Sequence, residues 1–102
     1  MQIEKLTEKA RQIIASSNEI ADKLDHQRLI PEHLLASFLD DKDAHIHSYL
    51  EGITEKLTFL TEKNNEALAK VPKVKGISDI LVDKIVITII STAERLAKEL
   101  ND

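Results

Sequence analysis

The sequence contains no cysteine, which excludes disulfide bonds, thiolate catalysis and zinc sites built from cysteine sulfur. This composition is compatible with a reducing compartment. Aromatic residues make up only 3% of the chain, so there is no platform of rings on which single-stranded nucleic acid could stack. With two glycines and two prolines, the chain is also poor in the turn signals of a many-stranded fold. These absences favour a helical domain with an aliphatic core.

The chain has no apolar run approaching the roughly 20 residues that span a bilayer, and residues 1–5 lack the basic and then apolar order of a signal peptide. We therefore expect a cytoplasmic protein without a membrane partner. Its 14 basic residues are scattered among 18 acidic ones, for a net charge of −4, whereas binding to phosphate backbones requires clustered Lys and Arg. This acidity disfavours nucleic acid, including a DNA-binding helix-turn-helix formed by the first two predicted helices. Proteins are the expected partners.

The 102 residues, 42% of them hydrophobic, suffice for one small domain. Apolar residues recur every three or four positions from residue 3 to residue 24, which predicts a helix with Thr7 as its N-cap. A second helix is predicted from Pro31 to about Leu39, because Pro suits the first helical position and Glu32 complements the helix dipole.

The charge run at residues 40–43 predicts a solvated loop. Asp43 is then expected to cap a third helix that ends at Gly52 and turns Ile46, Tyr49 and Leu50 inward.

Thr54 is expected to cap a fourth helix that ends just before Pro72. The β-branched run at residues 85–90 is compatible with a strand by propensity alone. Because apolar residues keep helical spacing to Leu100, we predict a helix here, capped by Ser78 or Asp83.

The chain contains an internal repeat. Residues 13–26 align with residues 89–102 at an offset of 76 (89 − 13), with identical pairs at Ile13/Ile89, Ile14/Ile90, Ala21/Ala97 and Leu24/Leu100. The sequence ends where the counterpart of residues 27–39 would begin. We infer a single module of two repeats that is cut inside its second repeat, with repeat 1 at about 1–76 and a partial repeat 2 at about 77–102.

The sequence resembles the N-terminal domain of the Clp family of AAA+ unfoldases, and most closely its ClpB disaggregase branch. The matching pieces follow the family's order and cover nearly the whole chain: Leu6–Ala10, His26–Leu35, Gly52–Leu57, Val71–Gly76 and Ala93–Glu99. One departure is Ile30, which replaces a Thr or Ser and removes the side-chain cap of the second helix, a loss of about 1 kcal/mol. By the resemblance, Asp83 stands where the family has a Ser that caps the last helix. This favours a helix that begins after Asp83 and leaves residues 77–82 extended.

The resemblance implies an all-α, orthogonal helical bundle of about five helices, comprising the first pseudo-repeat and the first helix of the second. It implies a non-catalytic domain that binds exposed apolar segments of misfolded protein, or an adaptor, on behalf of a homohexameric ATP-dependent disaggregase. The segment itself is expected to hold no cofactor. No Gly-rich phosphate loop occurs in the sequence, so ATP and Mg²⁺ are expected in ATPase modules of the parent protein.

The resemblance also implies site residues. Thr7, Ile90 and Asp102 fall on positions of the family's substrate-binding surface, and Glu32 falls on a position that contacts an adaptor or phosphorylated arginine. Each has a structural alternative: Thr7 as a helix cap, Ile90 as core, Asp102 as a frayed terminus and Glu32 as a first-turn carboxylate.

The four histidines do not predict a metal site. His45 and His47 are two residues apart and point in different directions on a helix, and His26 and His33 are expected to pack and hydrogen-bond at the interhelical turn. No histidine is paired with an evident nucleophile, so no catalytic residue is assigned.

Two functions remain open from the sequence. The first is the docking domain of a ClpB-type chaperone, and the second is a free-standing helical protein that regulates partners by binding them. The last predicted helix carries more apolar residues than one face needs. It must therefore pack on the first repeat, pair with another copy or be exposed, and the isolated chain is expected to be a monomer or a weak homodimer.

Overall fold

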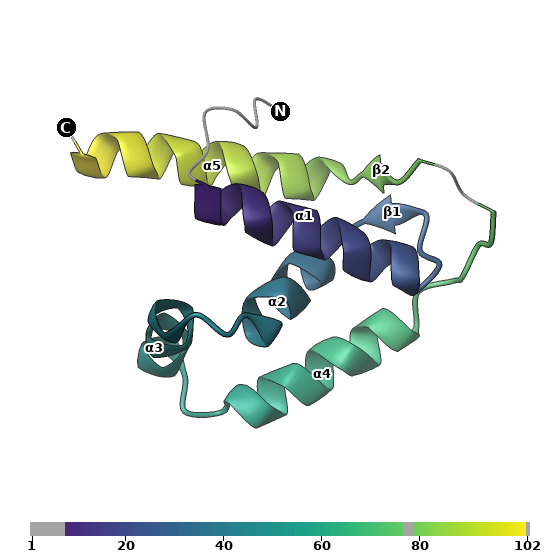
Figure 1. The fold of residues 1–102 in the computed structure, drawn as a ribbon, viewed down its shortest axis with the longest axis horizontal. Helices are drawn as coiled ribbons and strands as arrows, with labels where there is room; N and C mark the ends of the chain where they lie inside the picture. The colour runs from purple at the N-terminus through teal and green to yellow at the C-terminus, as the bar shows by residue number, and fades with distance from the viewer. Residues whose placement is uncertain (1–7, 77–78, 102) are drawn as a thin grey trace.

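The computed structural model of the chain describes residues 8–76 and 79–101. It confirms the predicted all-α fold of five helices, and adds a two-stranded parallel sheet in which Arg28 pairs with Leu81 and Leu29 with Val82 (Figure 1). The elements are α1 (Glu8–Lys23), β1 (Arg28–Leu29), α2 (Pro31–Asp40), α3 (Ala44–Ile53), α4 (Leu57–Ala69), β2 (Leu81–Val82) and α5 (Lys84–Asn101).

The helices form a flat bundle with α1 and α5 along one edge, α4 along the opposite edge and α2 between them (Figure 1). The molecule measures 44 × 33 × 20 Å, and its shortest dimension is about two helix diameters. This thickness leaves room for a single layer of core side chains between the helices. The core is aliphatic, as predicted, and joins α1, β1, α2 and α5 through Ile14, Ala21, Leu29, Leu34, Val86 and Ile90.

The first helix ends in a hydrogen-bonded C-terminal turn of the Schellman type. The backbone N–H of His26 donates to the carbonyl of Ala21 at 2.9 Å, and that of Asp25 donates to Asp22 at 3.1 Å. This turn places Asp25 in the left-handed region, with φ of 58°. The turn reverses the chain into β1, and buries His26 beneath the end of α1.

The second helix begins at Pro31, as predicted, and Ile30 supplies no side-chain cap. His33 compensates in part, because its Nδ1 atom accepts the backbone N–H of Ile30 at 3.0 Å. One otherwise unpaired amide at the helix start is thereby satisfied.

The boundaries around α3 and α4 differ from the prediction. The third helix continues through Gly52 to Ile53, and α4 begins only at Leu57. Thr54 does not cap α4: its hydroxyl accepts the N–H of Lys56 at 3.0 Å in a local turn, while its own N–H completes α3. A Ser or Thr can close such a turn as readily as a helix start. Tyr49, predicted to face inward, is 70% exposed.

The β-branched run at residues 85–90 lies within the helix α5, as predicted. Asp83 is the N-terminal cap, because its Oδ1 atom accepts the N–H of Ile85 at 2.9 Å. Ser78, the alternative cap, lies outside the described residues, and the helix begins well after it at Lys84. The extended segment expected before Asp83 contains β2.

Candidate docking surface

The fifth helix carries apolar side chains on two adjacent faces. Val86 and Ile90 are buried in the core, with exposed fractions of 0% and 7%. Beside them, Ile85, Ile89, Ala93, Leu96 and Leu100 are all exposed. At roughly 100° per residue these five positions fall within about 80° of arc. We call these five residues the α5 stripe.

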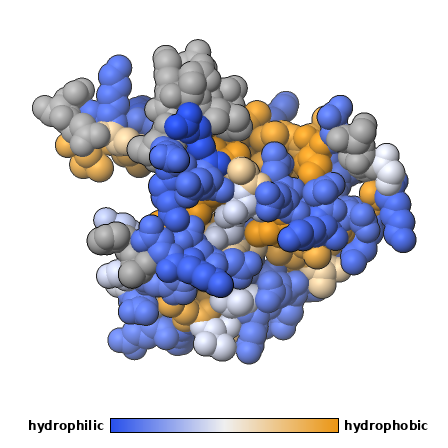
Figure 2. All heavy atoms as spheres, in the orientation of Figure 1, coloured by the Kyte–Doolittle hydropathy of each residue, from blue (hydrophilic) through white to orange (hydrophobic). Residues whose placement is uncertain are grey.

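The exposure of the stripe is large for aliphatic side chains. Ile85 is 59% exposed, Ile89 43%, Leu96 46% and Leu100 85%. Hydrophobic surface is visible along the upper edge of the molecule, where α5 lies (Figure 2). A continuous row of this kind differs from apolar residues scattered singly over a surface, and it is typical of a surface that binds another chain.

The opposite side of α5 is polar, and holds Thr88, Ser91, Arg95 and Lys98. Arg95 and Glu99 form an exposed ion pair at 3.0 Å along this side. Ile87 is the exception, because it is exposed to 41% but lies on the far side of the helix from the stripe. It therefore offers a natural comparison for the stripe.

The start of α5 is attached to the connection between α1 and α2. The N–H of Leu81 donates to the carbonyl of Gln27 at 2.9 Å, and the N–H of Asp83 donates to Leu29 at 3.0 Å. Together with Val86 and Ile90 in the core, these bonds hold the first turns of α5 in place. The second half of the helix, including Leu96 and Leu100, projects along the edge of the bundle (Figure 1).

Of the four predicted site residues, the structure describes Ile90 and Glu32, which lie in different contacts of the bundle. Ile90 belongs to the core, one position along the helix from Ile89 of the stripe. Thr7 and Asp102 lie outside the described residues. Glu32 is half-buried in the first turn of α2, where its carbonyl accepts the side-chain amide of Asn64 at 3.0 Å. Glu32 thus belongs to the contact between α2 and α4, whereas Ile90 belongs to the core that α1, β1, α2 and α5 share.

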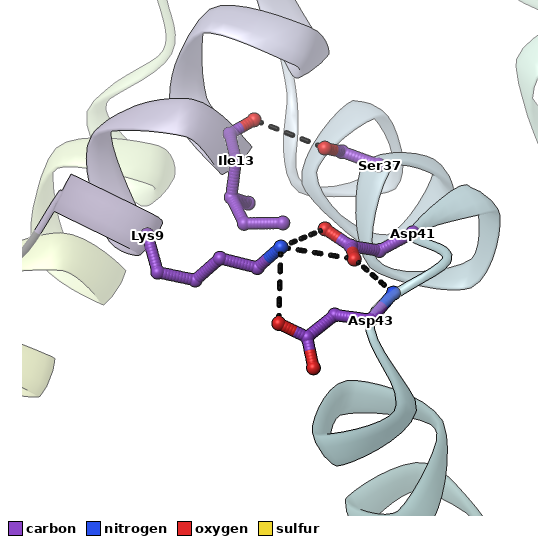
Figure 3. Close-up of polar contacts among 5 residues, drawn as sticks. All are labelled: Lys9, Ile13, Ser37, Asp41 and Asp43. Carbon is purple, nitrogen blue, oxygen red and sulfur yellow. Dashed lines mark hydrogen bonds and ion pairs between the residues drawn. The ribbon is translucent and has the colours of Figure 1, made fainter.

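The charge run at residues 40–43 is only partly the solvated loop that was predicted. Lys9 of α1 reaches Asp41, with Nζ at 3.0 Å from Oδ1 and 2.8 Å from Oδ2, and lies 3.6 Å from an oxygen of Asp43 (Figure 3). The hydrogen bond with Asp41 raises the pKa of Lys9, and the same bond lowers the pKa of Asp41. Periodicity along the chain cannot reveal a pair that is 32 residues apart.

A second polar contact fixes the crossing of α1 and α2. The hydroxyl of Ser37 donates to the carbonyl of Ile13 at 3.0 Å, and Ser37 is 3% exposed (Figure 3). The hydroxyl of Ser17 donates to Ile14 of its own helix at 2.7 Å. Small residues at these positions let the two backbones approach closely. The only hint in the sequence is a serine within the apolar face of the second helix.

The far side of α2 contributes to an open hollow of about 240 Å³ between α2, α3 and α4. Leu39, Leu50 and Leu57 supply its apolar lining, and His47 and Glu62 are among the remaining lining residues. The hollow is open and four of its seven lining residues are polar, so it is a weaker candidate for an apolar docking surface than the α5 stripe.

The histidines form no metal centre in the described residues, where no group of three potential ligands comes together. His26 and His33 pack and hydrogen-bond at the interhelical turn, as predicted, with Nδ1 of His26 at 2.8 Å from Nε2 of His33. Within residues 8–76 and 79–101, none of the helices is long and apolar enough to cross a membrane.

Comparison with known proteins gives one consistent result. The family model described as the Clp repeat (R) N-terminal domain matches residues 5–102. The chaperone protein ClpB of Rickettsia felis is 32% identical over 104 aligned residues, that of Agrobacterium fabrum 35% over 103, and that of Clostridium tetani 34% over 106. Each alignment covers 100% of this chain and 12% of the relative. The chain thus spans about an eighth of the length of these relatives.

Proposed function

The chain belongs to the Clp repeat N-terminal domain family, and on that premise we propose that it is the substrate- or adaptor-docking domain of a ClpB-type ATP-dependent disaggregase. It binds exposed apolar segments of misfolded protein by weak, reversible burial and performs no chemistry itself. The observation that carries this proposal is the α5 stripe, a row of exposed aliphatic side chains on a helix whose neighbouring face is fixed in the core.

The composition of the stripe suits clients of varied sequence. Ile and Leu side chains contact any apolar segment without demanding a particular hydrogen-bonding partner, because burial of apolar surface is non-directional. The shallow, exposed form of the surface limits the area buried on docking and keeps the affinity low. Weak binding fits a domain that must capture and then release its clients.

The proposal assigns roles to the predicted site residues. Ile90 acts from beneath the surface, because its packing in the core sets the orientation of Ile89 and the rest of the stripe. Thr7 and Asp102 are assigned to client binding only because they fall on the family's substrate-binding positions. Glu32 would serve a separate contact with an adaptor or a phosphorylated arginine at the start of α2.

The remaining parts of the proposed activity belong to the parent protein. Its ATPase modules would bind ATP and Mg²⁺, assemble as a homohexamer and pull on clients that the docking domain presents, in the cytoplasm. The curated relatives are named chaperones, which supports a protein client over a nucleic acid or a membrane.

An NMR titration of the isotopically labelled chain with casein, an unfolded client protein, tests the docking surface. We expect the amide signals of α5 to shift, and the shifts to weaken in Ile89→Ser. Burying the remaining exposed part of one Ile side chain contributes about 1 kcal/mol, so the variant should raise Kd by about fivefold.

Ile87→Ser is the matched control. It makes the same chemical change on the same helix at almost the same exposure, 41% against 43% for Ile89, but away from the stripe. We expect its Kd to equal that of the unaltered chain, with thermal melting curves confirming that both variants are folded. Equal weakening by both changes, or shifts confined to α3 and α4, would show that the stripe is not the docking surface.

The alternative function is a free-standing helical regulator that sequesters partners through the same stripe. The two functions are separated by the coding sequence that follows Asp102. Walker motifs downstream support the docking domain, whereas a stop codon directly after Asp102 supports the regulator.

A further inference from the structure

His26 and His33 form a buried pair that bridges the end of α1 and the start of α2. Their exposed fractions are 2% and 0%. The ring centroids lie 5.0 Å apart with the planes tilted by 51°, and Nδ1 of His26 lies 2.8 Å from Nε2 of His33. The docking proposal uses neither ring, so the pair requires its own explanation.

The hydrogen bonds fix the position of every proton in the pair. The backbone N–H of Ile30 always carries its hydrogen, so Nδ1 of His33, at 3.0 Å, must be the acceptor. The proton of neutral His33 is therefore on Nε2, which donates to Nδ1 of His26. His26 then carries its own proton on Nε2, which is buried without a hydrogen-bond partner among the described residues.

This chain of bonds has no place for an additional proton. A proton added to Nδ1 of His33 would face the N–H of Ile30, and a proton added to Nδ1 of His26 would face the N–H of His33. If the proton of His33 moves from Nε2 to Nδ1, the clash with His26 is relieved, but the new proton on Nδ1 then faces the N–H of Ile30. The folded arrangement therefore holds both rings neutral, and any further proton places two donors against each other.

The pair also holds the segment that anchors α5. The carbonyl of Asp25 accepts the N–H of Val74 at 2.7 Å, and the connection continues directly into β1, which pairs with β2 at the start of α5. We propose that the His26–His33 pair is a proton-operated latch, and that protonation in mildly acidic solution opens the connection between α1 and α2 and releases the start of α5.

The electrostatic surroundings set the direction of the pH response. Burial, and to a smaller extent the neighbouring His26, lowers the pKa of His33 to about 4. Burial also lowers the pKa of His26, aided by Lys73 from the segment after α4 and opposed by Asp25. Among the described residues, Glu32 on α2 is not one of the groups that shift the pKa of His33.

The direction of the pH response, and the pH range over which it occurs, follow from these pKa shifts. In the opened segment His33 takes up a proton at the ordinary histidine pKa of 6.5, whereas in the closed pair His33 does so only near 4. The latch is therefore closed above pH 6.5 and weakens as the pH falls from 6.5 towards 4. For His33 alone, the opening equilibrium should rise about 30-fold between pH 8 and pH 5.

Amide hydrogen exchange of the 102-residue chain at pH 8, 6.5 and 5, corrected for intrinsic exchange rates, tests the latch. We expect the opening equilibrium of the Leu29, Asp83 and Val86 amides to rise at least about 30-fold by pH 5. The amide of Leu68 in α4 should change much less. In His33→Gln, a non-titrating amide oxygen can still accept the N–H of Ile30, so the acid response of the three amides should fall to the part that His26 contributes. His47→Gln removes a histidine elsewhere and should retain it.

Three results would overturn the latch. These are exchange of the Leu29, Asp83 and Val86 amides that is independent of pH after correction, loss of the response in His47→Gln, and a full response in His33→Gln. If His33→Gln does not fold, ¹⁵N NMR titration of the ring nitrogens in the unaltered chain decides. The latch requires both rings to carry their proton on Nε2 at pH 8 and His33 to remain neutral at pH 5.5. Titration of His33 near pH 6.5 in the folded chain would refute it.

Discussion

Asp25 offers a sharp test of how α1 is terminated. It occupies the left-handed position after the helix, with φ of 58°, where glycine is the usual residue because it has no Cβ. Its carboxylate also lies at the negative end of the α1 dipole, where an anion is unfavourable. Asp25→Gly should therefore stabilise the protein, even though the acidic residue looks well suited to a surface turn.

The expected gain combines three effects. Relief of the left-handed strain contributes about 1 kcal/mol, and removal of the charge from the helix end about 0.3–1 kcal/mol. The greater freedom of glycine in the unfolded chain costs about 0.5–1 kcal/mol. The net stabilisation is about 0.5–1 kcal/mol, which raises the midpoint of thermal unfolding by roughly 3–6 °C for a domain of this size.

Two further substitutions at Asp25 separate these effects. Asp25→Asn keeps a side chain that tolerates the left-handed region and removes only the charge, so it should gain about 0.3–1 kcal/mol. Asp25→Ala removes the charge but retains a Cβ. Its left-handed strain of about 1–2 kcal/mol exceeds the entropic cost of glycine of about 0.5–1 kcal/mol, so it should be about 0.5–1 kcal/mol less stable than Asp25→Gly. Urea unfolding at pH 8, above the ordinary histidine pKa of 6.5, measures the stability of the Gly, Asn and Ala variants. If the Ala and Gly variants are equally stable, the left-handed strain has been misjudged.

Two predictions concern the contacts shown in Figure 3. Ser37→Ala removes the buried hydrogen bond to the carbonyl of Ile13 and should lower the free energy of unfolding, measured in urea, by about 1 kcal/mol. The control is Ser16→Ala at an exposed position of α1, which should change the free energy of unfolding very little. Equal effects of the two changes would show that the Ser37 bond contributes no stability. Lys9→Met removes the ion pairs with Asp41 and Asp43, and should lower stability at low ionic strength but much less in 1 M NaCl, because salt screens exposed charges. Lys9 lowers the pKa of Asp41 below 3.8. The difference in stability between the unaltered chain and the Lys9→Met variant should therefore be present above pH 3.8 and be lost as the pH falls through the lowered pKa. Lys42→Met is the control, because Lys42 is an exposed lysine between Asp41 and Asp43, and its effect on stability should depend on neither salt nor pH.

The helices could be predicted from the sequence because their signals are local. Helical spacing of apolar residues, Pro31 at a helix start and Asp83 before the last helix are each contained within a few neighbouring residues. The last helix was identified correctly despite its β-branched run, because the apolar spacing continued well beyond that run. Thr54 was misassigned for the same local reason, since a threonine suits both a helix cap and the turn that it forms.

The contacts between elements could not be predicted in the same way. Lys9 with Asp41, Ser37 with Ile13, and β1 with β2 each join residues that are distant in sequence, and such pairing depends on how the helices are arranged in space. The candidate surface was predictable in part. The excess of apolar residues in the last helix indicated exposure or pairing, but the division of α5 into a buried face and the stripe required the position of its neighbours.

The short pairing of β1 with β2 has a consequence for the order in which the chain folds. It joins Arg28 to Leu81, which are 53 positions apart (81 − 28), whereas α1, the connection and α2 are consecutive. Closing so long a loop costs entropy before any stabilising contact is gained. The consecutive helices should therefore assemble first, and α5 should join them last, as the slowest step of folding. By the same reasoning the helix that presents the stripe is the first to detach when the native protein fluctuates.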